Sequence, residues 1–315
     1  MLLAGTVALA SLLPAYGIGA TIANASADIG IVVLFFLHGA RLSRKAIIDG
    51  ARKWRLHAST GAMTFIVFPV LGLGLATLPF LDPWMARGLL FLSLLPSTVQ
   101  SSIAFTAMAG GNVPAAICSA SFSNLAGIAL TPLLVTLLMA GQGSGIAGGS
   151  TFAIIGKMLV PFIAGHLLRP LIGKWVDNHQ RMLSFVDRGS ILMVVYAAFS
   201  AAVVEGLWSL ISTRDLTLLV ILCSILLVIV LTATYITGRW LRFDRADTVV
   251  LQFCGSKKSL ATGVPMAGAL FARADVGLLI LPLMFFHQIQ LMVCAVLAQR
   301  YGRMAKNEER SAPAC

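Results

Sequence analysis

Long apolar runs of about 20 residues, separated by short basic clusters, are the feature of this sequence that most constrains its fold. A helix needs about 20 mostly apolar residues to cross the hydrocarbon core of a bilayer. The 315 residues are 58% hydrophobic and only 11% charged, whereas soluble domains are about 45–50% apolar and about 25% charged. The sequence therefore predicts an all-α integral membrane protein.

Ten membrane-spanning helices are expected from the apolar runs. The first run has no basic residue ahead of it, so it lacks the start of a signal peptide. A truncated start and a short first helix both remain open. The predicted spans are 1–23, 28–42, 56–81, 86–109, 113–140, 151–171, 189–211, 216–238, 247–271 and 276–299.

The basic residues follow the ten spans in alternation. Most Lys and Arg lie in one set of alternate loops and in the C-terminal tail, whereas the opposite loops contain Arg87, Arg214 and Arg273. Cytoplasmic loops carry the excess of basic residues. Both termini are therefore predicted to be cytoplasmic, in the cell (inner) membrane. This pattern indicates topology, and it argues against a nucleic-acid partner despite the net charge of +11. A basic segment from Ser43 to Leu56 suits an interfacial helix on anionic membrane lipid.

The chain divides into two halves of five spans near the Gly/Ser-rich stretch 141–150. Because five is odd, homologous halves would be inverted relative to each other. The fourth span of each half has a polar interruption, at 96–102 and at 255–259. Pro96 lacks an N–H, and Gly255 weakens a helix by about 1 kcal/mol relative to Ala. We expect two inverted five-helix repeats in which helices four and nine are discontinuous and cross at the midplane.

Lys257 and Lys258 lie well inside the ninth predicted span. A Lys at the centre of a spanning helix costs roughly 2.5–3.5 kcal/mol on insertion scales. We therefore favour a functional role over snorkelling of these side chains to the interface, and expect only one of the two to face the crossover. Their expected partners are the negative C-terminal ends of the half-helices, near Leu95 and Cys254, where an ammonium group takes the place of a bound cation.

The half-helices that follow, around Ser102 and Ser259, direct positive dipole ends at the same region and favour an anionic substrate group. Polar residues of spans five and ten either join this site or only form interhelical hydrogen bonds. The candidate substrate- and ion-binding residues are Gln100, Ser101, Ser102, Ser119, Asn124, Ser256, Lys257, Lys258, Ser259, His287, Gln288 and Gln290.

Signatures of enzymes and metal sites are missing from the sequence. It contains no HExxH, GxSxG, Walker lysine loop or SxxK motif. His287 has no second ligand at metal-binding spacing, and the five cysteines form no CxxC pair. No enzymatic activity, metal site or cofactor is predicted, and the coupling ion is left open between a proton and sodium.

Four runs carry a family resemblance: VLFFLHGARLS (33–43), the stretch from LLPSTVQSS to TPLL (94–134), QFCGSKKSLATGVPMAGALF (252–271) and LPLMFFHQIQLMVCAVLAQRY (281–301). They resemble the bile acid:sodium symporter superfamily, in the SBF-like branch that includes solute carrier family 10 member 7. The resemblance implies a panel domain (1–50, with 141–212 as linker and second part), a core domain (51–140 and 213–299) and a cytoplasmic tail (300–315).

The resemblance also implies where sodium would bind, and several of these positions have changed. The acid before the second crossover falls on Phe253, and the Gln-Asn pair falls on Lys257 and Lys258. The remaining sodium ligands of the family are a Ser-Asn pair and two hydroxyl groups. This chain has Ser101 and Ser102 in place of the pair, and Ala116 and Ala120 near the positions of the two hydroxyl groups. Losing a carboxylate and gaining two ammonium groups predicts poor sodium binding.

The leading hypothesis is a secondary transporter of a small organic anion or amphipathic solute, with proton coupling or no ion coupling. One alternative is a non-transporting regulator of ion (calcium) homeostasis, and another is a true sodium symporter with an altered site. The sequence indicates neither a particular substrate nor a protein partner.

The ten-span topology predicts the accessibility of the loops. A cysteine at Gln142 should react with an impermeant maleimide from outside the cell, and one at Arg242 only after the membrane is opened. The positive-inside rule gives this result because the two loops lie on opposite sides. Labelling of both positions from the same side would contradict the ten-span topology.

Overall fold

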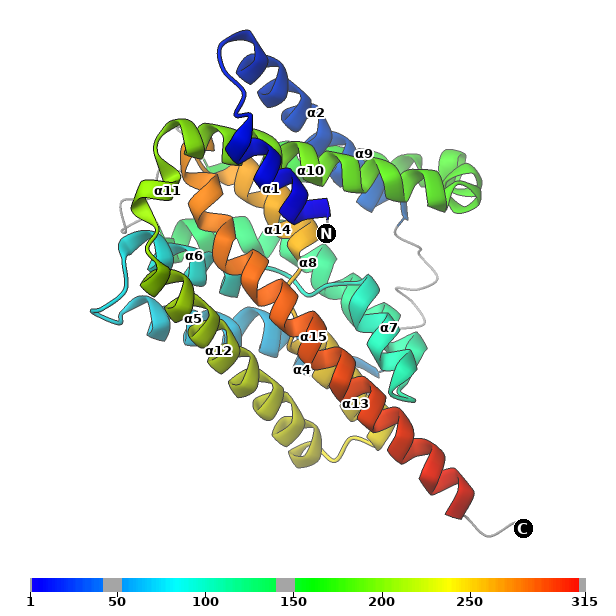
Figure 1. Cartoon of the computed structure of the whole chain (residues 1–315). Coiled ribbons are helices and arrows are strands. Elements are labelled where there is room, and N and C mark those ends of the chain that lie inside the picture. The colour runs from blue at the N-terminus through cyan, green and yellow to red at the C-terminus, as the bar shows by residue number, and fades with distance from the viewer. Residues whose placement is uncertain (1, 42–52, 140–150, 312–315) are drawn as a thin grey trace.

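The computed structural model describes residues 2–41, 53–139 and 151–311, and within these ranges it is helical with no strand (Figure 1). The predicted all-α class is confirmed. Residues 42–52 and 140–150, which include most of the predicted interfacial helix, lie outside the described ranges. In chain order the elements are α1 (Leu2–Leu12), α2 (Ile18–Arg41), α4 (Trp54–Ala62), the π-helical turn η2 (Met63–Val67), α5 (Phe68–Ala76), α6 (Pro83–Leu94), α7 (Gln100–Met108), α8 (Val113–Met139), α9 (Thr151–Asn178), α10 (Gln180–Val204), α11 (Leu207–Leu210), α12 (Thr213–Trp240), α13 (Arg245–Gly255), α14 (Leu260–Leu270) and α15 (Arg273–Ser311).

Several of these helices are long and apolar enough to cross a bilayer, and their outer faces are apolar. Large hydrophobic side chains such as Ile18, Leu171 and Trp240 are 81% exposed. Exposing apolar surface to water costs about 25 cal/mol per Å² of free energy. These apolar outer faces are therefore more stable against lipid than against water. The fold is that of a multi-pass membrane protein. The six candidate spans in the described residues are Ile18–Arg41, Trp54–Ala76, Val113–Met139, Gln180–Val204, Thr213–Trp240 and Arg273–Ala305.

The predicted boundary between the first two spans is wrong. The sequence predicted helices at 1–23 and 28–42, whereas α1 ends at Leu12 and α2 already begins at Ile18. Pro14 lies in the connection, and Gly17 has a φ of 52°, which is a left-handed conformation that glycine adopts readily. The chain therefore turns about ten residues earlier than the hydropathy pattern suggests.

Helices α9 and α10 also extend beyond the predicted spans 151–171 and 189–211, and they meet in a tight turn near His179. Their ends contain charged residues, which the sequence interpretation assigned to a loop. Within this extension Val176 and Leu183 are buried against Leu37 and Ala40 of α2. Packing of one apolar stripe therefore keeps the charged segment helical.

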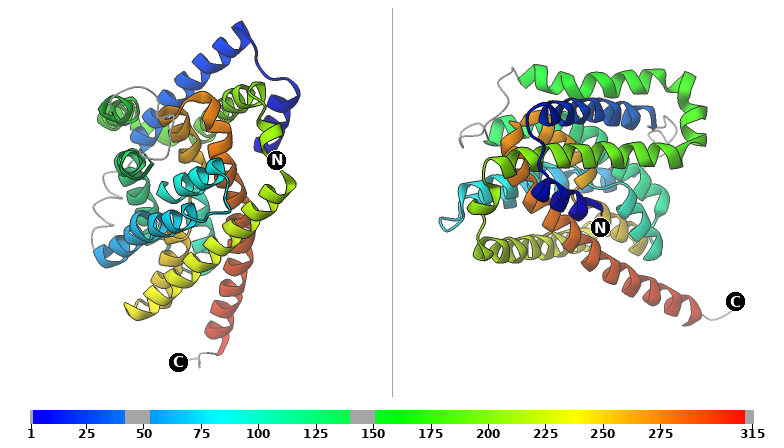
Figure 2. Two further views of the ribbon diagram at one scale, coloured as in Figure 1. Left: turned by 90° about the vertical axis from the view of Figure 1, so that its left-hand side faces the viewer. Right: turned by 45° about the horizontal axis from the view of Figure 1, so that its top comes forward.

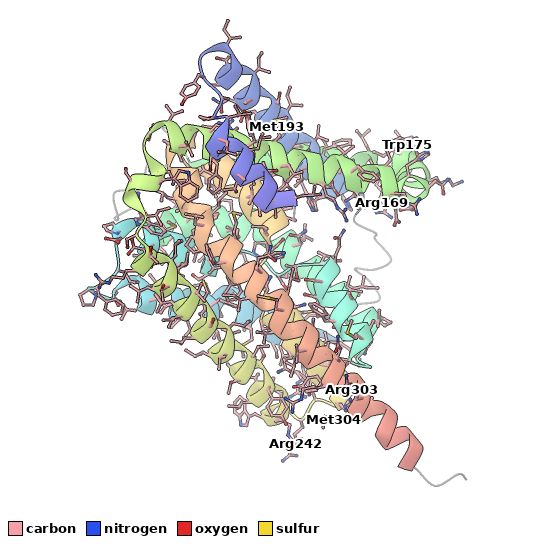
Figure 3. All side chains as sticks on the ribbon, viewed as in Figure 1. Arg169, Trp175, Met193, Arg242, Arg303 and Met304 are labelled. Atoms are coloured by element: carbon pink, nitrogen blue, oxygen red, sulfur yellow. The ribbon has the colours of Figure 1, made fainter. Side chains whose placement is uncertain are left out.

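Helices α1, α2, α9 and α10 lie together on one side of the molecule, and the helices from α4 to α7 with α12 and α13 lie on the other (Figures 1 and 2). Helix α2 packs along both α9 and α10. Arg169 and Trp175 lie toward the end of α9 that is remote from α11, whereas Arg242 and Arg303 lie near the opposite group of helices (Figure 3). The two groups meet through α8 and α15, which pack against members of both, while α14 packs on α2, α9 and α10 and on α15.

Two glycines set the distance between α2 and α9. A Cβ atom at Gly39 would lie 2.0 Å from the carbonyl oxygen of Phe162, and one at Gly165 would lie 2.0 Å from that of Phe36. No side chain fits at either position without moving a backbone. Small residues allow this close approach in membrane bundles, where dispersion between backbones replaces the hydrophobic effect.

This contact predicts the effect of one added methyl group. Gly165→Ala should destabilise the protein by about 1–3 kcal/mol because α2 and α9 must separate. Gly156→Ala on the same helix is the matched control, since nothing lies within 4 Å of its Cβ position. Thermal unfolding of the purified variants in detergent compares the two. Equal midpoints for both variants would contradict the close packing.

Candidate functional site

The two predicted interruptions are present, and they contact each other. Helix α6 ends at Leu94 and α7 begins at Gln100, while α13 ends at Gly255 and α14 begins at Leu260. The backbone N–H of Ser259 donates to the carbonyl oxygen of Pro96 at 2.9 Å. The Ser102 hydroxyl donates to the carbonyl oxygen of Phe253, also at 2.9 Å. The two helices are therefore broken at a common point where each satisfies backbone groups of the other.

The ammonium group of Lys258 lies at the centre of this crossover. It is fully buried and donates to three backbone carbonyl oxygens: Thr64 at 2.9 Å, Ser93 at 2.7 Å and Leu95 at 2.6 Å. The nitrogen also lies 4.2 Å from the ring centroid of Phe68, within the range of a cation–π interaction. An ammonium has three donors and no acceptor, so this set of ligands satisfies it completely.

Local sequence explains why the carbonyl oxygens of Thr64 and Ser93 are free. In η2 the N–H of Phe68 donates to Met63 instead of Thr64. The next residue, Pro69, has no N–H, so the Thr64 oxygen has no helical donor. In the first break the N–H of Ser97, which would reach Ser93 in a continuous helix, donates to the Ser123 hydroxyl at 3.0 Å. A π-helical turn and a broken helix thus supply a cation-binding set of oxygens.

Helix α8 also contacts the C-terminal end of α6. Thr131 of α8 donates its hydroxyl to the carbonyl oxygen of Leu94 at 2.8 Å, between the two carbonyls that bind Lys258. Gly127 on the same helix accommodates Pro96, because a Cβ there would lie 2.6 Å from the proline side chain. Helix α8 therefore fixes the position and shape of the first break.

Lys257 lies in a different environment from Lys258. Its ammonium donates to the carbonyl oxygen of Ser101 at 3.0 Å. It lies 3.9 Å from the ring centroid of Phe105 and 5.3 Å from that of Phe253. The sequence interpretation expected an acceptor near Cys254 for one ammonium, but the four carbonyl acceptors belong to η2 and to the first break with its flanking helices. Desolvated cation–π contacts are worth about 2 kcal/mol, which partly offsets the burial of this charge.

Gln290 of α15 holds the second break in its open conformation. Its side-chain oxygen accepts from the N–H of Lys258 at 3.0 Å, and its side-chain nitrogen donates to the carbonyl oxygen of Lys258 at 2.9 Å. The same nitrogen lies 2.9 Å from Nδ1 of His287. One amide side chain thus replaces the two backbone hydrogen bonds that an unbroken helix would give this residue.

The candidate residues separate into three groups. Those that line the cavity described next are Gln100, Ser101, Asn124, Ser259 and His287. Those that are buried in hydrogen bonds of the crossover and its supports are Ser102, Ser119, Ser256, Lys257, Lys258 and Gln290. Gln288 lies on the exposed face of α15 and does not line the cavity, so the structure gives it no place in the site.

A cavity of about 570 Å³ lies between α2, α9 and α10 on one side and the two breaks, α8 and α15 on the other. The break residues reach it through Thr98 to Ser101 and Ser259 to Ala261. Helix α7 begins here, and no side chain caps its N-terminus. An N-terminus with free N–H groups facing a cavity favours an anionic ligand.

Sequence reasoning missed the charged residues on the opposite wall of this cavity. His38 and Arg41 of α2 and Asp187 and Arg188 of α10 all line it. Asp187 fell outside the predicted seventh span because that span was started at 189, and Arg41 and Arg188 were interpreted only as topology signals. The apolar stripe of α10 continues back to Leu183. This continuation is the sequence signal that would have placed Asp187 within the helix.

Interrupted helices that cross at a buried charge, beside a cavity between two groups of helices, define the class of multi-pass membrane transporters. The model of the SBF-like CPA transporter family matches residues 1–303, and the chain belongs to that family. This is a transporter family and not a class of enzymes.

Relatives at high and moderate identity cover most of the chain. An uncharacterised protein of Pseudomonas aeruginosa is 54% identical over 307 residues, covering 96% of this chain and 91% of that protein. YfeH of Escherichia coli K12 is 49% identical over 302 residues, with 95% and 91% covered. The sodium/bile acid cotransporter 7 of Rattus norvegicus is 30% identical over 275 residues, with 85% and 81% covered.

The two glutamines of α15 allow a paired test of the second break. Gln290→Leu removes both partners of the buried Lys258 backbone and should lower stability by about 2–4 kcal/mol. Gln288→Leu, two residues away on the exposed face, should leave stability unchanged. Thermal unfolding in detergent measures both. If the two variants unfold at the same temperature, Gln290 does not hold the break open.

Proposed function

We propose that the protein is a secondary active transporter of an organic anion or amphipathic solute, with alternating access around the crossover of the two broken helices. The observation that carries the proposal is the Lys258 ammonium, held by three carbonyl oxygens where the breaks meet. The substrate is proposed to occupy the cavity beside it, between the two groups of helices.

The proposed architecture has ten spans in two inverted five-helix repeats. The first repeat comprises α1, α2, α4 with α5, α6 with α7, and α8; the second comprises α9, α10, α12, α13 with α14, and α15. We assign 1–50 and 141–212 to a panel domain, 51–140 and 213–299 to a core domain, and 300–315 to a tail. Packing of α2 on α9 and α10, and the contact between the two breaks, support this division. Both termini are proposed to be cytoplasmic in the inner membrane.

The fixed ammonium is proposed to replace a coupling sodium ion. Three carbonyl oxygens around one monovalent cation are the type of oxygen site that broken helices provide for sodium. Here the cation is part of the chain and already satisfies these oxygens, so a second cation would meet both repulsion and a lack of ligands. We infer proton coupling or no ion coupling, although the name of the rat relative includes sodium.

An anionic, amphipathic substrate fits the chemistry of the cavity. Its walls combine apolar side chains with the arginines Arg41 and Arg188 and the start of α7. Ligand cavities of about 300–1,000 Å³ accommodate small organic molecules. The apolar outer surface leaves membrane lipid as the constant partner of the protein.

Replacing the ammonium tests both transport and coupling. Wild-type proteoliposomes should accumulate labelled cholate, used as an amphipathic carboxylate, at the same rate in sodium and in choline. Lys258→Ala should abolish uptake, because three buried carbonyl oxygens are left without a donor, and should destabilise the protein by about 3–5 kcal/mol.

The same variant should gain a property that the wild type lacks. Sodium or methylammonium should raise the unfolding temperature of Lys258→Ala in a saturable way, because the emptied set of oxygens can accept a free cation. Lys257→Ala is the matched control, since Lys257 binds a single carbonyl oxygen and its removal leaves no such set. A saturable, sodium-selective rise in the unfolding temperature of the wild type, or full uptake by Lys258→Ala, would contradict the proposal.

A further inference from the structure

An Arg–Asp ion pair crosses the cavity wall opposite the two breaks. Arg41 is the last residue of α2, and Asp187 lies on α10. The guanidinium Nη1 atom donates to Oδ2 of the carboxylate, and the two side chains are 29% and 16% exposed. Both residues line the cavity. The pair is therefore accessible to a molecule in the cavity while being largely withdrawn from bulk solvent.

This pair leaves much of its hydrogen-bonding capacity unused. Nη2 of Arg41 and Oδ1 of Asp187 are both buried, and neither has a hydrogen-bond partner in the described part of the chain. An arginine that only stabilises a fold commonly binds a carboxylate through two parallel N–H···O bonds. Buried polar atoms without partners are rare in native proteins and indicate a missing ligand or an exchange of partners.

A second ion pair of the same protein shows the contrast. Lys53 donates to both oxygens of Asp247, at 2.8 and 2.6 Å, and Asn112 also donates to that carboxylate at 2.9 Å. That pair lies outside the cavity and has its acceptors in use. Among the ion pairs found in the described residues, Arg41–Asp187 is the one that leaves buried polar atoms of both partners without a hydrogen bond.

The charges around this pair favour an anion. Arg188 follows Asp187 and also lines the cavity, as do His38 and Ser184, each one helical turn before a member of the pair. Asp187 is the one carboxylate among the lining residues of the described chain, against two guanidinium groups. An incoming oxyanion would therefore compete with a single internal carboxylate for Arg41.

The rest of the cavity defines the kind of molecule that carries this anion. Apolar side chains from α2, α8, α9, α10 and α15 form the wall between the ion pair and the breaks: Leu34, Leu125, Ile128, Phe162, Ile191 and Leu291. A ligand with an apolar body and one charged end matches this distribution, because its body stays on the apolar wall while its charge reaches the guanidinium.

We propose that Arg41 binds the carboxylate or sulfonate group of an amphipathic organic anion, and that Asp187 occupies Arg41 until the anion replaces it. This inference rests on the proposed transport function and specifies its substrate class and headgroup site. The exposed part of the Arg41 side chain lets the anion approach from the cavity, and displacement of Asp187 then frees Nη1 and Nη2 of Arg41 for a bidentate contact. Asp187 thereby sets the affinity without contacting the anion itself.

Equilibrium binding to the purified protein in nanodiscs tests this competition without requiring transport. The probes are cholate and its uncharged methyl ester, which share one steroid body. Asp187→Asn should bind cholate about tenfold more tightly than the wild type, and Arg41→Gln about tenfold more weakly, because a hydrogen bond to a charged group is gained or lost. Binding of the methyl ester should change in neither variant.

Two further variants separate competition from a general change in charge. Asp177→Asn is the matched control, because Asp177 pairs with Arg169 of the same helix at 3.9 Å and does not line the cavity. It removes the same charge and should leave cholate binding unchanged. In the double variant Arg41→Gln/Asp187→Asn, the gain from Asp187→Asn should disappear, since the two residues act through one contact.

Three results would overturn the proposal: equal cholate affinities of Asp187→Asn and Asp177→Asn, a gain that persists in the double variant, or no cholate binding to any variant. The transport proposal fails separately. Binding that depends on Arg41 without flux in wild-type proteoliposomes would leave the anion site and reject transport. Flux in wild-type proteoliposomes, without any dependence of binding on Arg41 or Asp187, would keep the transport proposal and reject the anion site.

Discussion

The burial of one ammonium group determines much of this structure. An unpaired charge in the membrane interior is costly, so Lys258 must have a complete set of acceptors, and only backbone carbonyl oxygens supply it. Those oxygens become available only if α6 stops early and if the helix of α4 and α5 contains a π-helical turn. Gln290 and Ser123 then satisfy the backbone groups that these irregularities leave. A single side chain thus requires coordinated departures from regular helix in three segments of the chain.

Sequence reasoning located both breaks because their signals are local. Pro96 and Gly255 interrupt apolar runs directly, and a lysine inside a span is conspicuous on composition alone. The acceptors of Lys258 were only partly predictable. Leu95 follows from its place at the end of a half-helix, whereas Thr64 depends on a π-helical turn that combines with Pro69, and no periodicity rule reports such a turn.

The charged wall of the cavity escaped prediction for a related reason. Hydropathy treats a charged residue near the end of a span as a loop residue, although the helix continues as long as one face stays apolar. Val176 and Leu183 provide that face in the turn between α9 and α10. Asp187 therefore lies within a helix, opposite Arg41, through contacts between segments 146 positions apart in the chain. Such pairing is a property of the tertiary structure.

A cation that is covalently part of the protein has a thermodynamic consequence. A sodium ion that binds and dissociates on opposite sides of the membrane delivers the free energy of its gradient, whereas a tethered ammonium is never released and delivers none. Moving one net charge across the membrane involves about 2.3 kcal/mol per 100 mV. A monoanion carried without a mobile partner is therefore pushed out of a cell whose interior is negative. Under the proposed function without proton coupling, a transporter whose cation is fixed would therefore favour export of its anion over accumulation.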